Sequence, residues 1–150
     1  SALAASDFYV IPVFPEPESA RGLLDLLKST VEIREDINPA LALLGVVITK
    51  FDKRSATHRE FADTIRAIGK NAKVRVFANQ IPMSGSVPAA SKKQISLIEY
   101  RNDLPISQAY IALAGEILPL LGKKKTGRPS IPNVEKFSQY VDEIEEILAP

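Results

Sequence analysis

Apolar runs alternate with amphipathic stretches along the chain, and this alternation predicts strands separated by helices. A short run of residues that favour strands spans 8–13, and a near-continuous apolar run at 43–49 is typical of a parallel strand covered on both faces. A third run, at 74–82, predicts another strand and its exit. The order strand, helix, strand, helix, strand with short connections predicts a parallel sheet with right-handed crossovers. We therefore expect an α/β fold.

The first two predicted helices have recognisable ends. One begins at Ser19 and ends before Asn38-Pro39, because a proline disfavours helical backbone in the residue before it. The other has capping-box spacing at Thr57 and Glu60 and is expected to end at Gly69. The apolar faces consist of Ala20, Leu23, Leu24, Leu27 and Val31 in the first helix and Phe61, Ile65 and Ile68 in the second.

A long loop and two further helices are predicted after the third strand. The loop is rich in small residues and runs from Met83 to about Ser96. Pro105 has a natural first helical position, and Gly122 is expected to close that helix. After a basic linker, Asn133 caps a last amphipathic helix. The helix that begins at Pro105 has a predicted apolar face of Ala109, Tyr110, Leu113, Ile117 and Leu121.

Composition excludes several classes of function. The 150 residues suffice for one domain, and a formal net charge of +1 shows no overall bias toward nucleic acid or membranes. The absence of cysteine excludes disulfides, thiolate zinc sites and a cysteine nucleophile. No apolar run approaches the ~20 residues of a membrane span. The single histidine, His58, lies on the polar side of its predicted helix, so we expect it to be solvated. The chain starts without methionine, and we expect a fragment of a longer protein.

Two strand ends are candidate binding sites. Thr49 and Asp52 follow the second predicted strand, where open α/β sheets place their ligands. Alternatively, Asp52 only starts the turn and caps the next helix. Ile81-Pro82 and the loop behind it could line a ligand, or the loop could be an ordinary surface loop.

Basic residues form a second candidate site, for the phosphates of a nucleic acid. No aromatic residues alternate with the lysines, so base stacking is not indicated, and a solvated surface is the alternative. The residues are Lys92, Lys93, Arg101, Lys123, Lys124, Lys125 and Arg128.

A series of short motifs occurs in order along residues 1–121. It consists of Ala2-Leu3-Ala4-Ala5-Ser6-Asp7, Ile11-Pro12-Val13 with Pro15-Glu16 and Gly22-Leu23, Asn38-Pro39-x-Leu41-x-x-Leu44-Gly45 with Thr49-x-x-Asp52, Ile81-Pro82, Glu99-Tyr100, and Gln108-Ala109-Tyr110 with Leu113-Ala114 and Glu116. The series resembles the C-terminal half of the ParA family of partition ATPases, which are deviant-Walker relatives of MinD. The resemblance implies a P-loop-NTPase-like, parallel-sheet partial domain over 1–121, followed by a basic linker (122–132) and a C-terminal helix (133–150).

The resemblance also implies a function for the full protein. That function is an ATPase, dependent on ATP and Mg, that forms homodimers, binds DNA non-specifically and acts with a ParB-type centromere-binding partner in plasmid or chromosome partitioning. The implied location is cytoplasmic, with association with the nucleoid and none with membranes. By position, Thr49 and Asp52 would lie near the nucleotide, and Ile81-Pro82 would lie against the adenine.

Several family features have no counterpart in this sequence. No G-K-[ST] phosphate-binding loop occurs, so the chain alone should neither hold ATP tightly nor hydrolyse it, and we assign it no catalytic residue and no metal site. Met83 and Pro105 stand where the family often has arginines linked to DNA contact. DNA binding would then depend on the basic residues named above. The alternatives are a non-enzymatic orphan ParA-like module that binds DNA or a protein, and another deviant-Walker ATPase.

Overall fold

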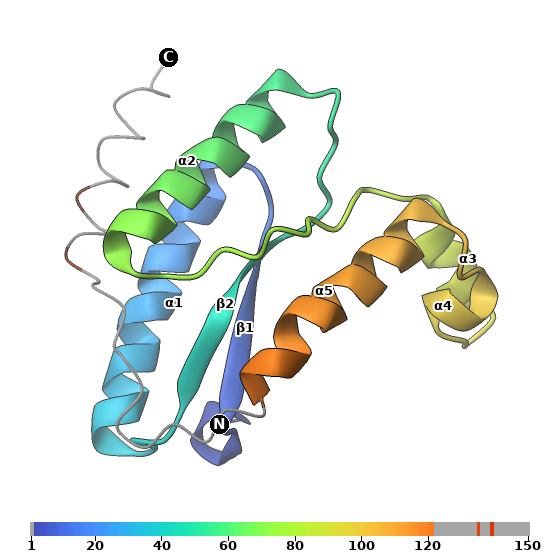
Figure 1. Cartoon of the computed structure of the whole chain (residues 1–150). Coiled ribbons are helices and arrows are strands. Elements are labelled where there is room, and N and C mark those ends of the chain that lie inside the picture. Colours follow the sequence, from blue (N-terminus) through green and yellow to red (C-terminus); the bar gives the residue numbers. More distant parts are fainter. Residues whose placement is uncertain (1, 122–134, 136–138, 140–150) are drawn as a thin grey trace.

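The computed structural model describes residues 2–121, 135 and 139. Helices and strands alternate at first, and short helices follow (Figure 1). The elements are η1 (Ala2–Ala5), β1 (Phe8–Val13), α1 (Pro17–Asp36), β2 (Ala42–Ile48), α2 (Ala56–Ala72), α3 (Ser86–Lys92), α4 (Leu97–Tyr100) and α5 (Pro105–Leu121).

β1 and β2 form a parallel pair, as predicted. The register runs from Phe8 opposite Ala42 to Val13 opposite Ile48, with one irregularity after Tyr9. The chain at 74–82 runs along the other side of β2 but is not a regular strand, because it forms only two isolated bridges, Val76 with Val46 of β2 and Pro82 with Phe51 just after β2. The prediction of a full third strand is therefore wrong. The physical reason is that a side chain of α5 takes two of the backbone N–H groups of this segment, as described below.

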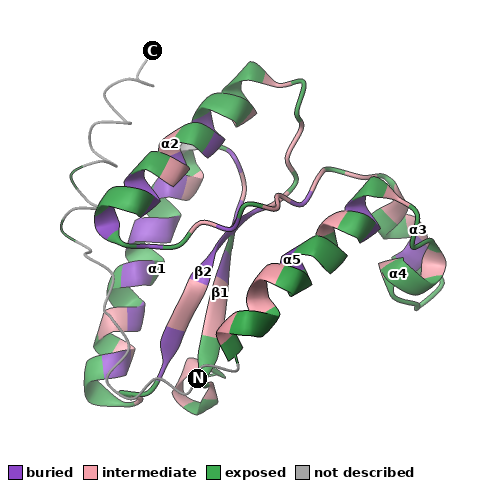
Figure 2. Ribbon diagram, viewed as in Figure 1, coloured by how far each residue is buried: buried purple, intermediate pink, exposed green. Residues whose placement is uncertain are grey.

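Helices cover both faces of this sheet (Figure 1). α1 and α2 pack on one face, in a core that includes Leu27 and Ile65. α5 packs on the other face, where Leu113 meets Val47 and Phe77. Figure 2 shows buried residues along the inner sides of α1 and α2 and along the strands between them and α5. The two layers of helix confirm the α/β class.

The predicted ends of α1 are close to those observed, but the ends of α2 differ. Ser55, not Thr57, is the N-cap of α2, and its Oγ accepts from the N–H of His58. Gly69 lies inside α2 and does not end it; the helix continues to Ala72, and Lys73 adopts the left-handed conformation. A Cβ at position 69 would lie 2.6 Å from the carbonyl oxygen of Val74, so this glycine serves close packing.

The second half of the chain is more helical than predicted. The expected loop from Met83 to Ser96 contains α3, and α5 begins at Pro105 as predicted. The apolar face of α5 is shifted, because Tyr110 and Leu121 are exposed whereas Ile106 is buried. The basic linker, the helix expected at 133–150 and the expected end at Gly122 lie outside the residues that can be described. Within the described part of the chain, no helix is long and apolar enough to cross a bilayer.

Candidate functional site at the carboxyl ends of the strands

Thr49 joins the carboxyl ends of the two strands. Its backbone N–H donates to the carbonyl oxygen of Val13 at 2.8 Å, and its Oγ1 donates to the same oxygen at 3.1 Å. One carbonyl group at the end of β1 therefore accepts both hydrogen bonds. This arrangement fixes the half-buried Thr49 side chain at the edge of the sheet where α/β proteins bind ligands.

Asp52 starts the turn between β2 and α2. Its Oδ1 accepts from the backbone N–H of Arg54 at 2.9 Å, as in an Asx turn. This hydrogen bond, together with the nearby positive charge of Arg54, holds the pKa of the Asp52 carboxyl below its usual value. The alternative interpretation of Asp52 is thus half right: Asp52 forms the turn, but Ser55 caps the helix.

His58 connects this turn to the loop after β1. Its Nδ1 accepts from the backbone N–H of Asp52 at 3.0 Å. The ring packs edge-on against Phe14 with centroids 5.8 Å apart and lies 6.1 Å from the ring of Phe51. The expectation of a solvated histidine is wrong, because His58 is half-buried and holds two loops together. This position could not be predicted because the N-cap of α2 was expected at Thr57. With Ser55 as the N-cap, His58 is the third residue of the helix and faces back to the turn.

Ile81-Pro82 lies beside the same turn. The N–H of Phe51 donates to the carbonyl oxygen of Ile81 at 3.0 Å, and the N–H of Met83 donates to that of Phe51 at 3.1 Å. The Ile81 side chain is 3% exposed and belongs to the core under α5, whereas Pro82 is half-buried. The structure therefore brings all four predicted nucleotide-site residues to one edge. Both backbone groups of Ile81 are already bonded, its N–H to Ile48 and its carbonyl oxygen to Phe51, so only the half-buried Pro82 ring remains open to a ligand there.

Glu116 of α5 fixes the segment that leads to Ile81-Pro82, and sequence reasoning gave it no role. Its carboxylate accepts from the N–H of Ala78 at 2.9 Å and from the N–H of Asn79 at 2.8 Å. It also accepts from Asn79 Nδ2 at 2.5 Å. Burial raises the pKa of Glu116, but these hydrogen bonds and the positive charge of Arg75 outweigh burial and lower it overall. Glu116 is the only charged residue of α5, and this was the available signal.

Three of the seven basic candidate residues lie in the described part of the chain. Lys92 ends α3, and Lys93 Nζ lies 5.3 Å from the centroid of the Tyr100 ring. The Arg101 guanidinium is bound to Asp103, with an Nη2–Oδ2 distance of 2.5 Å. Lys92, Lys93 and Arg101 thus lie together in the corner formed by α3, α4 and the residues just after them. Of the three, Arg101 is paired with a carboxylate. Lys123, Lys124, Lys125 and Arg128 lie outside the described residues.

Clusters of metal-ligating side chains were sought in the described part of the chain. Among the residues from 2 to 121, with 135 and 139, no group of three or more His, Cys, Asp or Glu side chains could hold a metal ion.

The fold is similar to that of solved structures. Cobyrinic acid a,c-diamide synthase from Mycobacterium smegmatis, solved with a bound ATP analog and magnesium, superposes with a TM-score of 0.61 at 20% identity, over 85% of this chain and 45% of that chain. The structure of the same enzyme with bound ADP and magnesium superposes with a TM-score of 0.60. These likenesses place the chain in the P-loop-NTPase-like class of α/β folds.

The sequence relatives are more specific. The chain is 30% identical over 119 residues to the chromosome-partitioning ATPase Soj of Thermus thermophilus, covering 79% of this chain and 46% of Soj. It is 29% identical over 118 residues to the chromosome partitioning protein ParA of Caulobacter vibrioides, covering 79% of this chain and 43% of that protein. No protein-family profile matches the sequence. The chain is therefore similar to the partitioning proteins of the ParA family, and it spans less than half the length of the curated relatives it matches.

Proposed function

We propose that the chain forms the base-side wall of an ATP site in a ParA-like partition ATPase, as the C-terminal portion of the full protein. The observation that carries this proposal is the gathering of Thr49, Asp52 and Ile81-Pro82 at the carboxyl edge of the parallel strands. Ligands of open α/β sheets bind at this edge. The relatives named as partitioning proteins and the solved structures with bound ATP analog or ADP and magnesium support the choice of nucleotide.

In this proposal the chain provides position and shape, and the phosphates and Mg are held elsewhere in the full protein. Pro82 would present its ring to the base, because the Ile81 side chain is already buried in the core. Thr49 and the turn at Asp52 would border the nucleotide. Glu116 would keep the segment before Pro82 in place. Homodimerisation, non-specific DNA binding and a ParB-type partner belong to the same proposal for the full protein, in plasmid or chromosome partitioning.

DNA binding by this chain would use the corner that contains Lys92, Lys93 and Arg101, together with the basic linker. Two observations support this surface. The three side chains cluster at α3 and α4, and Lys and Arg are the side chains that most often contact DNA phosphates. An orphan ParA-like module that binds DNA or a protein without ATP is the second candidate. It is favoured by the absence of a G-K-[ST] loop from the sequence.

A chimera tests the nucleotide site. Residues 1–121 would replace the matching segment of Thermus thermophilus Soj, and ATP affinity would be measured by calorimetry. We expect the chimera to bind ATP, and Thr49→Val to weaken binding about tenfold, or ~1.4 kcal/mol. Thr64→Val is the matched control, because Thr64 lies on α2 with its Oγ1 bonded to its own helix.

Two results would count against the proposal. The first is a folded chimera that does not bind ATP, and the second is an equal ATP affinity of the Thr49→Val and Thr64→Val variants. Either result would show that the chain does not form the base-side wall of an ATP site. The chain alone should show no stabilisation by Mg-ATP, whereas binding at 100-fold excess over Kd would add ~2.7 kcal/mol. If the chain alone instead binds DNA and the chimera lacks ATP binding, the orphan module is the better description.

A further inference from the structure

His58 binds the turn after β2 through a ring nitrogen that carries no proton. Its Nδ1 accepts from the backbone N–H of Asp52 at 3.0 Å. Because an accepting ring nitrogen must be unprotonated, this hydrogen bond assigns the proton of the neutral ring to Nε2. Among the described residues, no other group accepts from the Asp52 N–H. The turn therefore keeps this hydrogen bond only while His58 is neutral.

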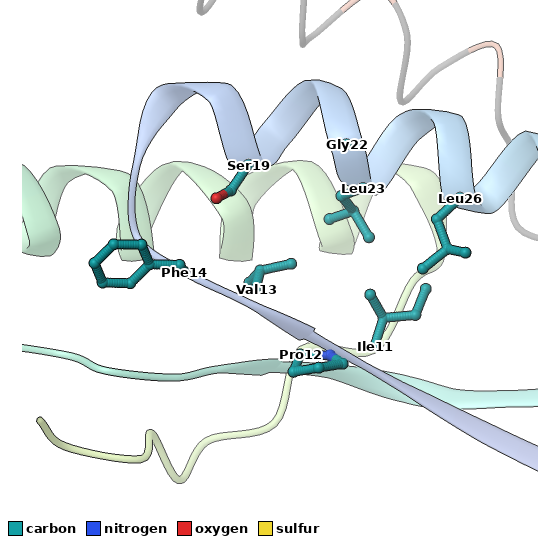
Figure 3. A pocket seen from close by; sticks show the side chains of 8 residues that line it. All are labelled: Ile11, Pro12, Val13, Phe14, Ser19, Gly22, Leu23 and Leu26. Carbon is teal, nitrogen blue, oxygen red and sulfur yellow. The ribbon is translucent and has the colours of Figure 1, made fainter.

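Two aromatic side chains from different loops hold the His58 ring. Phe14 packs against it edge-on with the centroids 5.8 Å apart, and the Phe51 ring lies 6.1 Å away at a tilt of 43°. Figure 3 shows Phe14 where the chain leaves β1 and turns toward α1. Phe14, Phe51 and His58 are all half-buried. This packing limits the rotation of the imidazole and keeps Nδ1 directed at the Asp52 N–H.

The backbone links the Asp52 turn to the other side of the proposed nucleotide site. Phe51, directly before Asp52, donates its N–H to the carbonyl oxygen of Ile81 and accepts the N–H of Met83 on its own carbonyl oxygen. Pro82 lies between these two bonded residues. A displacement of Asp52 would therefore be transmitted through Phe51 to the segment that contains Pro82.

Charged groups of both signs surround the His58 ring. The Asp52 carboxylate is close enough for its charge to interact with that of His58. Lys50 Nζ lies over the Phe14 ring, 5.5 Å from its centroid, and Arg54 Nε lies 3.5 Å from Asp52 Oδ1. The charged residues on the segments that pack against His58 are Glu16, Lys50, Asp52, Lys53, Arg54, Arg59 and Glu60. A protonated ring would be attracted to the Asp52 carboxylate, which already accepts from the Arg54 N–H.

We propose that His58 is a positioning residue for the nucleotide edge, which holds the Asp52 turn when its ring is neutral and releases it when the ring is protonated. A proton that binds Nδ1 places an N–H where the lone pair was, so two donors then face each other. Histidine is the side chain that ordinarily takes up its proton between about pH 8 and pH 5. Acid should therefore loosen the edge at which the full protein would bind ATP. The inference rests on the proposed function for the ligand alone.

Nuclear magnetic resonance on the full chain tests the effect on the turn. The chain contains a single histidine, so the ring signals report His58. We expect the Nε2–H tautomer at about pH 8. Between about pH 8 and pH 5, the exchange protection of the Asp52 amide should fall about tenfold with the same midpoint as the ring, as for the loss of one hydrogen bond. The Val46 amide, bound to the carbonyl oxygen of Arg75, is the control and should keep its protection.

Two substitutions separate the hydrogen bond from the packing of the ring. His58→Asn keeps an acceptor near Nδ1 but does not titrate, so the Asp52 amide should stay protected at both pH values. His58→Phe keeps a ring against Phe14 and Phe51 but has no acceptor, so this amide should be unprotected at both. Circular dichroism would check that each variant is folded. An Nδ1–H tautomer at high pH, an Asp52 amide that does not follow the ring, or a protected amide in His58→Phe would overturn the proposal.

The Soj chimera described above tests the consequence for the nucleotide. ATP affinity would be measured at both ends of the pH range for the unmodified chimera and for its His58→Asn variant, since the titration of the ATP phosphates is common to both. We expect the unmodified chimera to lose about fivefold more affinity on acidification. Equal losses would overturn the link between His58 and the nucleotide. If the Asp52 amide follows the ring but the chimera binds no ATP at any pH, the role of His58 in the turn stands and the nucleotide proposal alone fails.

Discussion

Glu116 of α5 binds Asn79 through both the backbone N–H and the side-chain Nδ2, with the same Oε1 accepting both. The two residues are 37 positions apart, and the contact fixes α5 against the extended segment beside β2. It also replaces strand pairing there, because the N–H of Ala78 is bound by the other carboxylate oxygen. Removing the carboxylate should therefore loosen both α5 and the segment before Pro82.

We expect Glu116→Ala to lower the free energy of unfolding by about 1–3 kcal/mol, since it leaves several donors without their charged acceptor. Urea denaturation followed by circular dichroism measures this change. Glu32→Ala on α1 is the control, because the exposed Glu32 has no bonding partner among the described residues. Equal effects of the two substitutions would contradict the role given to Glu116.

The same carboxylate should make stability depend on pH. The pKa of Glu116 is lowered in the folded chain from 4.5, so its stabilisation is fully present above that value. The stabilisation is lost as the pH falls through the lower pKa of the folded state. Glu116→Gln should flatten the decline in the free energy of unfolding below pH 4.5, measured against Glu32→Gln. A decline of the same steepness in both variants would contradict this expectation.

Two substitutions test whether Ser55, as in the structure, or Thr57, as expected from the sequence, caps the N-terminus of α2. Ser55→Ala should cost about 1 kcal/mol, because the Ser55 Oγ accepts from His58 N–H. Thr57→Ala should change stability by less than about 0.5 kcal/mol, because Thr57 is an exposed residue inside the helix. Thermal unfolding of both variants decides between the two positions. A larger loss of stability for Thr57→Ala than for Ser55→Ala would contradict Ser55 as the cap and support the capping box expected from the sequence at Thr57.

Much of the fold was predictable because its signals are local. The apolar run that forms β2 and the 3–4 spacing of α1 depend on residues close together in sequence. The common position of Thr49, Asp52 and Ile81-Pro82 at one edge of the sheet could be predicted because each follows an apolar run. The regular strand expected at 74–82 fails because the competing acceptor, Glu116, lies far away in sequence. No local pattern could have shown that contact.

Gly69 illustrates the same limit. A glycine near a helix end suggested a C-terminal cap, but this one is needed because Val74 and Val76 approach α2 closely. Gly69→Ala should lower the free energy of unfolding by about 1–3 kcal/mol through overpacking. Gly115→Ala, at a helical position with no atom within 4 Å of the added Cβ, should be neutral or stabilise by about 0.5–1 kcal/mol. Chemical denaturation of the pair checks the difference, and a neutral Gly69→Ala would contradict the close contact.

The pairing of Arg101 with Asp103 bears on DNA binding. If the corner at α3 and α4 binds phosphates, Asp103→Asn frees the Arg101 guanidinium and should tighten binding to a short duplex. The slope of log affinity against log salt should then steepen by about 0.9. Asp63→Asn makes the same charge change at an ion pair on α2 and is the control. Equal slopes in the two variants would exclude Arg101 from the DNA surface.

The spatial order of the sheet also has a consequence for how the chain folds. β1 lies beside β2, and β2 lies beside the 74–82 segment, so each piece pairs with its next neighbour in sequence. Each pairing closes a long crossover, since Phe8 lies opposite Ala42 with the whole of α1 between them, so these parallel contacts form slowly, but none of them needs a piece that comes later in the chain. Residues 8–82 can therefore assemble in the order in which a ribosome would deliver them, with α5 added last through Glu116. Slower folding of Glu116→Ala would place that last step in the folding transition state, whereas faster unfolding alone would place it after the transition state.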